Sequence, residues 1–369
     1  MRWILVADFT LTFLVALFLT WIMRRLAMRW GFVDIPGGRK KHEKVTPQGG
    51  GVAIVLSSTL AILGSAALAY LAHARPDLLS LPPALIPDAR RAARTLPLLL
   101  YVLGGGFAIA FFGLWDDLRP FRPVTKLLLQ IVIISTVVLT SGMRISLFIQ
   151  ADWVQAVVTI GWIVLLTNSF NLLDNMDGLS GSIAFVCGGS LLVLALQTNQ
   201  FFIAGFLLAV MAGALGFLFF NWPPATIFMG DTGSMFLGYM LATATALSTF
   251  MTAERLNPLF PALVPLIIFA VPLYDTLSVL LIRLHHGRHP LAGDRNHLSH
   301  RLHRLGMSQR RVLATIVLMT LATALGASVP YGSSTWRVVV PAVQALAALC
   351  VLVQLELAGS EISYPEKPV

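Results

Sequence analysis

The chain has 369 residues, of which 57% are hydrophobic and 12% charged, and its mean hydropathy is +0.79. Ordinary soluble domains carry about 25% charged residues, so this composition excludes a soluble globular domain, and no nucleic-acid partner is expected despite the net charge of +9. We therefore expect an all-α, polytopic integral membrane protein with a single domain over residues 1–369.

Apolar runs of roughly the 17 to 25 residues that span a bilayer recur along the chain. We predict about eleven transmembrane helices, with ten as the alternative because several runs are short or contiguous. They cover residues 3–23, 51–72, 97–115, 127–142, 154–168, 181–197, 201–220, 234–251, 259–282, 312–329 and 337–357. The first run lacks a small-residue cleavage pattern, so we expect an anchor rather than a signal peptide.

Lys and Arg gather in alternate loops, which predicts an outer N-terminus and an inner C-terminus. Under this topology, the loops after the first, third, fifth, seventh and ninth spans all lie on the cytosolic side. A basic inner face suits anionic lipid headgroups and phosphorylated substrates. Alternatively, the positive-inside rule alone explains why the basic residues gather on this face, with no role in binding.

The first inner loop joins basic residues, among them Lys44, to the run Gly49-Gly50-Gly51 at the start of the second span. Free backbone N–H groups at a helix start could hold a phosphate. The same glycines could instead let helices pack closely, and the sequence leaves the two interpretations open.

The stretch that ends the fifth span is rich in oxygen-bearing side chains. Its polar residues and glycines are Asn168, Asn171, Asp174, Asp177, Gly178 and Gly181. Asn171 and Asp174 share a helix face, whereas Asn168 and Asp177 can join them only if the helix breaks, as the glycines would allow. Hard oxygen donors without Cys or His suit magnesium rather than zinc. A plain solvated loop is the alternative.

Two further acidic motifs follow odd-numbered spans. Asp116 and Asp117 end the third span, with Lys126 nearby. One carboxylate could bind a metal while the other contacts a reacting group. Alternatively, one caps a helix and the other is only a surface charge. Asn221 ends the seventh span, and Asp231 lies between glycines that let the backbone turn tightly at the mouth of the eighth.

Asp275 is an ionisable residue within the ninth span. Such residues are costly in a membrane, so we expect Asp275 to have a functional role. The last inner loop, 283–311, is rich in His and Arg and includes Arg288, Arg295, His297 and His300. Such side chains can bind a pyrophosphate, whereas zinc would need a tighter ligand set.

These motifs are expected to form one site. Placing five of the carboxylates at mid-bilayer would cost roughly 12 to 18 kcal/mol, at about 2.5 to 3.5 each, so the cytosolic rim is favoured. The five are Asp116, Asp117, Asp174, Asp177 and Asp231. We predict a hydrated acidic cleft with basic walls, open to both water and lipid.

On these ordered motifs the chain resembles the polyprenyl-phosphate N-acetylhexosamine-1-phosphate transferases, the superfamily that includes phospho-N-acetylmuramoyl-pentapeptide transferase. The resemblance implies that Asp231 and Asn171 hold Mg²⁺, with Mn²⁺ as the alternative, and that Asp116, Asp117 and Asp174 are essential carboxylates. It implies substrate-binding roles for a larger set. These residues are Lys44, Lys126, Asn168, Asp177, Asn221, Asp275, Arg288, Arg295, His297 and His300.

The implied reaction transfers a sugar-1-phosphate, with N-acetylglucosamine expected, from a UDP-sugar to undecaprenyl phosphate and releases UMP. It would begin a cell-envelope glycan at the cytosolic face of a bacterial inner membrane. The oligomeric state is left open, with a homodimer as one alternative. The hexosamine-phosphate branch usually has His-x-His-His, and this chain has His297-Leu-Ser299-His300 there, which leaves the role of Ser299 open. The muramoyl-pentapeptide branch would show a different, triple-histidine loop, which argues against the pentapeptide substrate. A transporter or flippase is the alternative from another class.

Overall fold

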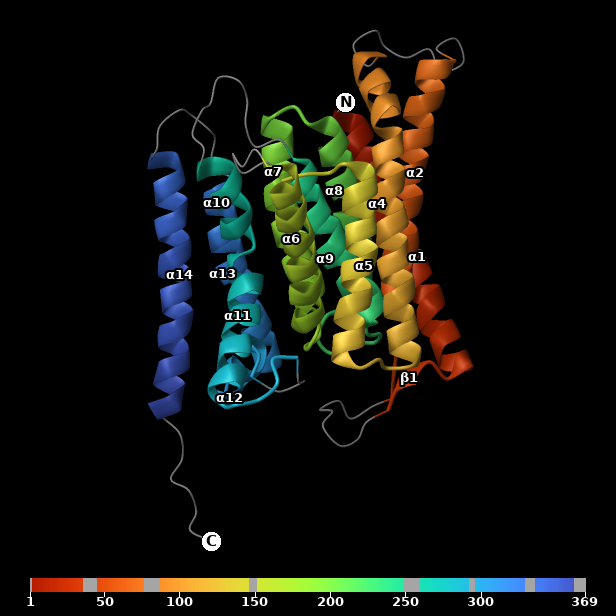
Figure 1. Ribbon diagram of the computed structural model, residues 1–369. Helices are drawn as coiled ribbons and strands as arrows, with labels where there is room; N and C mark the ends of the chain where they lie inside the picture. Colours follow the sequence, from red (N-terminus) through yellow and green to blue (C-terminus); the bar gives the residue numbers. More distant parts are fainter. Residues whose placement is uncertain are drawn as a thin grey trace.

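The structure is a computed structural model that describes residues 2–35, 45–75, 86–145, 151–248, 259–291, 296–328 and 336–361. Within these ranges the chain forms a bundle of long helices with a single two-stranded hairpin, which confirms the predicted all-α membrane class (Figure 1). The first half contains α1 (Arg2–Trp30), β1 (Val33–Asp34), β2 (Thr46–Pro47), α2 (Gly50–Ala74), α4 (Ile86–Leu118), α5 (Pro123–Ser141) and α6 (Asp152–Leu173). The second half contains α7 (Leu179–Gln197), α8 (Phe201–Asn221), α9 (Gly230–Leu247), α10 (Leu259–Ile268), α11 (Ala270–His285), α12 (Leu298–Arg304), α13 (Gln309–Ala327) and α14 (Trp336–Glu361).

Each predicted span overlaps one of these helices or a consecutive pair, and residues 249–251 and 329 of the predicted spans lie outside the described ranges. Nine helices in the described ranges are long and apolar enough to cross a membrane. The other two predicted spans correspond to α9, which opens on polar residues, and to the pair α10 and α11, which is interrupted at Phe269. The orientation of the termini across the membrane stays a prediction.

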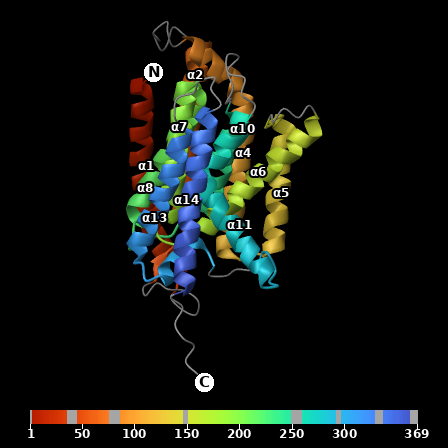
Figure 2. The same ribbon diagram turned by 90° about the vertical axis from the view of Figure 1, so that its left-hand side faces the viewer.

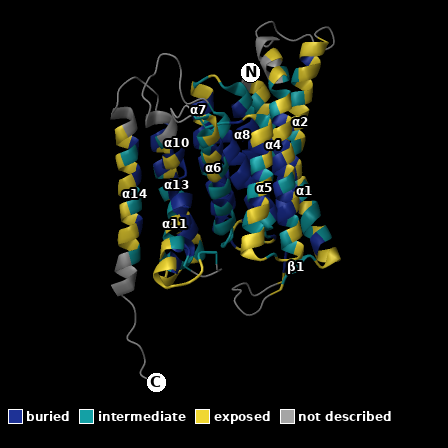
Figure 3. Ribbon diagram, in the orientation of Figure 1, coloured by how far each residue is buried: buried dark blue, intermediate teal, exposed yellow. Residues whose placement is uncertain are grey.

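Helices α8 and α9 form the centre of the bundle. Both are buried over most of their length, whereas α1, α5 and α14 expose apolar side chains on the outside (Figures 2 and 3). On α9, the buried Tyr239 hydroxyl donates to Val102 O of α4 at 3.1 Å. Apolar outer faces of this kind are expected where helices meet lipid.

Close backbone contact joins the start of α2 to the segment before α9. Gly50 N donates to Phe228 O and Gly51 N to Met229 O, both at 2.9 Å. A Cβ at Gly51 would lie 2.2 Å from the backbone nitrogen of Gly233. Backbone carbonyls therefore already accept from the N–H groups of both glycines. The interpretation as close helix packing is confirmed, and the interpretation that these two N–H groups bind a phosphate is wrong.

The connections after α1, α4, α6, α8 and α11 all lie at the lower end of the bundle, opposite the end marked N (Figure 1). This arrangement confirms that the loops after the odd-numbered spans share one side. It brings the acidic motifs within reach of one another.

Candidate active site

Asp117 holds the first turn of α9 from the end of α4. Its Oδ1 accepts from Asp231 N at 2.8 Å, and its Oδ2 accepts from Thr232 N at 3.1 Å and from Thr232 Oγ1 at 2.8 Å. These are orphan donors of a helix start, so Asp117 acts as a cap supplied by another helix. Gly230 has φ +74° and a Cβ there would meet Asp117 Oδ2 at 2.6 Å, which explains the glycine.

The Asp231 carboxylate lies between three helices. Asn171 Nδ2 of α6 donates to Asp231 Oδ1 at 2.7 Å, and the Lys126 ammonium of α5 contacts Asp231 Oδ2. Lys126 Nζ also lies 3.1 Å from Asp116 Oδ2, while Asp116 Oδ1 accepts from Phe121 N at 2.7 Å. Lys126 therefore joins two carboxylates that are 115 positions apart in sequence.

Asp174 ends α6 beside this group and is crowded by negative charge. Desolvation, followed by the charges of Asp231, Asp117 and Asp177, raises the pKa of Asp174 well above its ordinary value, and a hydrogen bond from the Gly230 backbone opposes the shift. The helix stops at Asp174 and α7 starts after Gly178, whose φ is +74°. The break therefore spans residues 174–178 and includes Gly178, one of the two predicted glycines, whereas Gly181 lies inside α7.

The donor chemistry of this cluster fits a hard cation. Asp231, Asp174 and Asn171 offer oxygen donors, and burial together with the neighbouring carboxylates raises the pKa of Asp174, a repulsion that a bound cation would relieve. Within the described ranges, no three His, Cys, Asp or Glu side chains are arranged as a ready metal site. Lys126 instead supplies the positive charge beside Asp231. The metal roles of Asp231 and Asn171 stay predictions.

Asn168 lies one turn before Asn171 on α6. Its Nδ2 donates to Gln130 Oε1 of α5 at 2.6 Å and to Val164 O at 2.8 Å. Gln130 is fully buried. A lone Gln within an apolar span carries no local motif, so the sequence gives no signal for this contact. The pair fixes α5, which carries Lys126, against α6.

Asp177 and Asn221 tie the loop after α6 to the loop before α9. Asp177 Oδ2 accepts from Ala225 N at 3.0 Å. Asn221 is buried, with Oδ1 accepting from Gly178 N and Nδ2 donating to Ile227 O, each at 2.8 Å. Both side chains thus stabilise the loops around the carboxylates, and their predicted substrate contacts stay predictions.

Asp275 anchors α12 from within the bundle. The fully buried carboxylate accepts from Leu298 N at 2.6 Å through Oδ1, and its Oδ2 lies 3.0 Å from His297 Nδ1. Ser299 Oγ donates to Asn175 Oδ1 of the loop after α6. Asp275 and Ser299 therefore position the histidine loop against the carboxylate side, a link that sequence spacing did not reveal.

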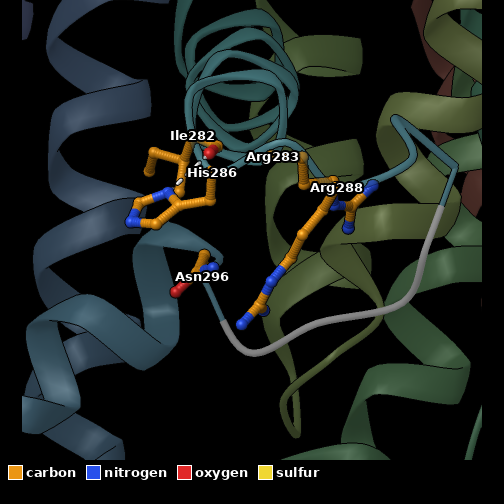
Figure 4. A pocket seen from close by; sticks show the side chains of 5 residues that line it. All are labelled: Ile282, Arg283, His286, Arg288 and Asn296. Atoms are coloured by element: carbon orange, nitrogen blue, oxygen red, sulfur yellow. Dashed lines mark hydrogen bonds between the residues drawn. The ribbon is translucent and has the colours of Figure 1, made fainter.

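His300 lies near His297, with ring centroids 6.4 Å apart. Beside them is a small pocket of about 180 Å³, lined by Ile282, Arg283, His286, Arg288 and Asn296 (Figure 4). Figure 4 shows the Arg288 side chain extending into the open region next to Asn296. Arg288 thus lines a pocket with other basic side chains, and its predicted substrate binding stays a prediction. Lys44 and Arg295 lie outside the described residues.

The chain is similar in sequence to proteins of known family. The profile of the family described as glycosyl transferase family 4 matches residues 99–249, the segment that carries the carboxylates of α4, α6 and α9. A probable undecaprenyl-phosphate N-acetylglucosaminyl 1-phosphate transferase of Bacillus subtilis is 30% identical over 90% of this chain and 86% of its own. The chain belongs to glycosyl transferase family 4.

Other relatives match over similar lengths. A decaprenyl-phosphate N-acetylglucosaminephosphotransferase of Mycolicibacterium smegmatis is 31% identical over 85% of this chain and 79% of its own. An undecaprenyl-phosphate alpha-N-acetylglucosaminyl 1-phosphate transferase of Yersinia pestis is 26% identical over 85% and 80%. The resemblance to polyprenyl-phosphate N-acetylhexosamine-1-phosphate transferases is confirmed.

Proposed function

We propose that this protein transfers N-acetylglucosamine-1-phosphate from a UDP-sugar to undecaprenyl phosphate and releases UMP. The relatives named above are transferases for N-acetylglucosamine on a polyprenyl phosphate. Their names favour this reaction over the pentapeptide transferase, and family membership favours a transferase over a transporter. The reaction would start a cell-envelope glycan at the cytosolic face of the bacterial inner membrane.

The observation that carries the proposal is the joining of Asp117, Asp231, Asn171 and Lys126 at one end of a membrane bundle. A lipid phosphate and a water-soluble nucleotide can meet at such a rim. Phosphoryl transfer depends mostly on positioning and charge neutralisation, and this cluster supplies both.

In the proposed reaction, an oxygen of the lipid phosphate forms a bond to the sugar-linked phosphorus while the bond to UMP breaks. A phosphate monoester has its second pKa near 6, so the acceptor needs no general base at neutral pH. Asp116 has both oxygens engaged, by Phe121 N and Lys126. We therefore assign Asp116 to positioning Lys126, whose ammonium can attract the phosphates.

We also propose that Asp231, with Asn171 and Asp174 beside it, holds Mg²⁺, or Mn²⁺ in its place. A bound divalent ion would supply charge neutralisation for the diphosphate. The chain's own residues do the remaining work: Asp117 fixes the Asp231 backbone, and the loop of His297, with Arg288 nearby, faces the nucleotide-sugar side.

We expect Asp231→Asn to abolish UMP release, by at least about a hundredfold, since loss of one charge-stabilising group costs roughly this factor. The assay uses purified protein in detergent with UDP-N-acetylglucosamine, undecaprenyl phosphate and Mg²⁺. Asp152→Asn is the matched control because Asp152 is exposed and pairs with Arg144 at the other end of the bundle. Substantial turnover by the Asp231 variant would remove Asp231 from the reaction centre.

Chelation of divalent ions with EDTA should stop UMP release in the same assay, and added Mg²⁺ or Mn²⁺ should restore it. Full activity after exhaustive chelation would exclude the metal. A panel of UDP-sugars assayed one by one would then identify the donor, and UMP release from UDP-N-acetylglucosamine should be the fastest.

A further inference from the structure

A second basic pocket lies at the lower end of α1, and none of the carboxylates of the cluster lines it. It has a volume of about 520 Å³ and is lined by residues of α1, of the segment 45–47 and of the loop before α9. Figure 1 shows β1 next to this end of α1. Its lining residues are Arg24, Arg25, Met28, Arg29, Val45, Pro47 and Thr226. Among the described residues that line it there are three guanidinium groups and no carboxylate.

The arginines of this pocket are partly held in place. Arg24 Nη1 donates to Thr226 Oγ1 at 3.4 Å, and the Arg24 guanidinium lies 5.5 Å from the Phe220 ring centroid. The Arg25 guanidinium stacks 3.8 Å from the centroid of Trp21. Guanidinium groups ordered by aromatic rings keep their donors for an anion, and a planar fork of donors matches phosphate oxygens.

The surroundings of the pocket point to a lipid rather than a soluble anion. Met28, Val45 and Pro47 give the pocket an apolar wall. Trp21 and Trp30 flank these arginines along α1 and are both exposed, and Trp30 is 69% accessible. Tryptophan belts of this kind mark the level of lipid headgroups, and basic pockets next to a membrane helix bind anionic heads.

We propose that this pocket binds the phosphate headgroup of an anionic membrane lipid, separately from the transfer site. The three arginines and the Thr226 hydroxyl would hold the phosphate, and the apolar wall would contact the start of the acyl chains. The loop of Thr226 also carries Ala225, whose N–H donates to Asp177, and Pro47 O accepts from Phe228 N at 2.9 Å. A bound lipid would therefore stabilise the segment that leads into α9.

The test measures lipid binding and needs no turnover, so its outcome is independent of the proposed reaction. The full chain is placed in phosphatidylcholine nanodiscs doped with phosphatidylglycerol, and bound phosphatidylglycerol is measured by native mass spectrometry. Arg24→Gln/Arg29→Gln should weaken retention by about 30-fold, because each direct guanidinium contact with the bound phosphate that is lost should cost about 1 kcal/mol.

Arg119→Gln/Arg311→Gln is the matched control, since it removes the same charge from the same end of the bundle outside the pocket. It should retain phosphatidylglycerol like the unmodified protein. If the double pocket variant fails to fold, the exposed Arg29→Gln alone should still weaken retention about fivefold. Equal losses in pocket and control variants would overturn the proposal. Displacement of the lipid by equimolar inorganic phosphate would also overturn it, because the pocket would then be a site for the free anion.

Discussion

At the scale of single residues, the adjacent residues Asp116 and Asp117 contact different partners and have different structural roles. Asp116 and Asp117 are adjacent, yet Asp116 contacts Lys126 and Phe121 N, whereas Asp117 caps α9 through Asp231 N and Thr232. Adjacent helical side chains point in different directions, which makes this division geometrically natural. The cap was one of the alternatives for the pair, and the structure shows that it serves a helix far along the chain.

We expect Asp117→Asn to destabilise the protein and reduce UMP release. An amide can offer one oxygen to the three donors, and its NH₂ group would face an N–H of Asp231 or Thr232. A buried donor without a partner costs about 1–3 kcal/mol. Thermal unfolding in detergent and UMP release measure the two effects.

Thr232→Val is the graded control for this prediction. It removes the hydroxyl bond to Asp117 Oδ2 and leaves both backbone bonds, so the expected loss is about 1 kcal/mol. If Asp117→Asn were as stable and active as the unmodified protein, the capping role would be excluded.

At the scale of elements, the short helix α12 depends on its contacts with the bundle. It has seven residues, too few to be stable alone, and Asp275 of α11 receives its Leu298 N–H. At its other side Arg301 pairs with Glu356 of α14 at 3.2 Å and donates to Ser278 of α11. The histidine loop is therefore ordered by tertiary contacts from α11 and α14.

Asp275→Ala should release α12 locally while the bundle remains folded. The variant leaves Leu298 N and the buried His297 ring without their partner, at about 1–3 kcal/mol for each unpaired group. Hydrogen exchange over residues 296–304 should rise strongly.

Asp275→Asn is the conservative comparison, because it keeps an oxygen for Leu298 N and should raise exchange less. Unchanged exchange in Asp275→Ala would contradict the anchoring role. In both variants the exchange of α9 should stay as in the unmodified protein, since Asp117 caps that helix independently.

At the scale of the whole molecule, the bundle has two chemically different ends. One end collects the carboxylate cluster, the histidine loop and the pocket of Arg24, whereas the exposed Trp153 and the ion pair of Arg144 with Asp152 lie at the other. The basic residues predict that the first end faces the cytosol.

This orientation is tested by cysteine labelling in a background without Cys187 and Cys350. A membrane-impermeant maleimide should label Trp153→Cys in intact spheroplasts, and should label Arg119→Cys only after permeabilisation. Both positions are exposed, so accessibility to the reagent reflects the side of the membrane. The reverse pattern would contradict the outer N-terminus.

The sequence alone determined the membrane class and the approximate positions of the helices, because long apolar runs in a bilayer must satisfy their own backbone hydrogen bonds as helices. It also grouped the acidic motifs at one end, since alternate loops of a bundle share a side. The carboxylate types and their order along the chain were sufficient to indicate the family.

Only the tertiary structure decided what each polar residue contacts. Asp117 caps α9, Asn221 joins two loops and Asp275 holds α12 through partners between 23 and 115 positions away. Such contacts depend on how the helices pack and rotate, and an apolar helix that is buried on every side carries no periodicity that fixes its rotation. Residue types and spacing therefore predicted the set of groups in the site, and packing decided which of them bind and which hold the others in position.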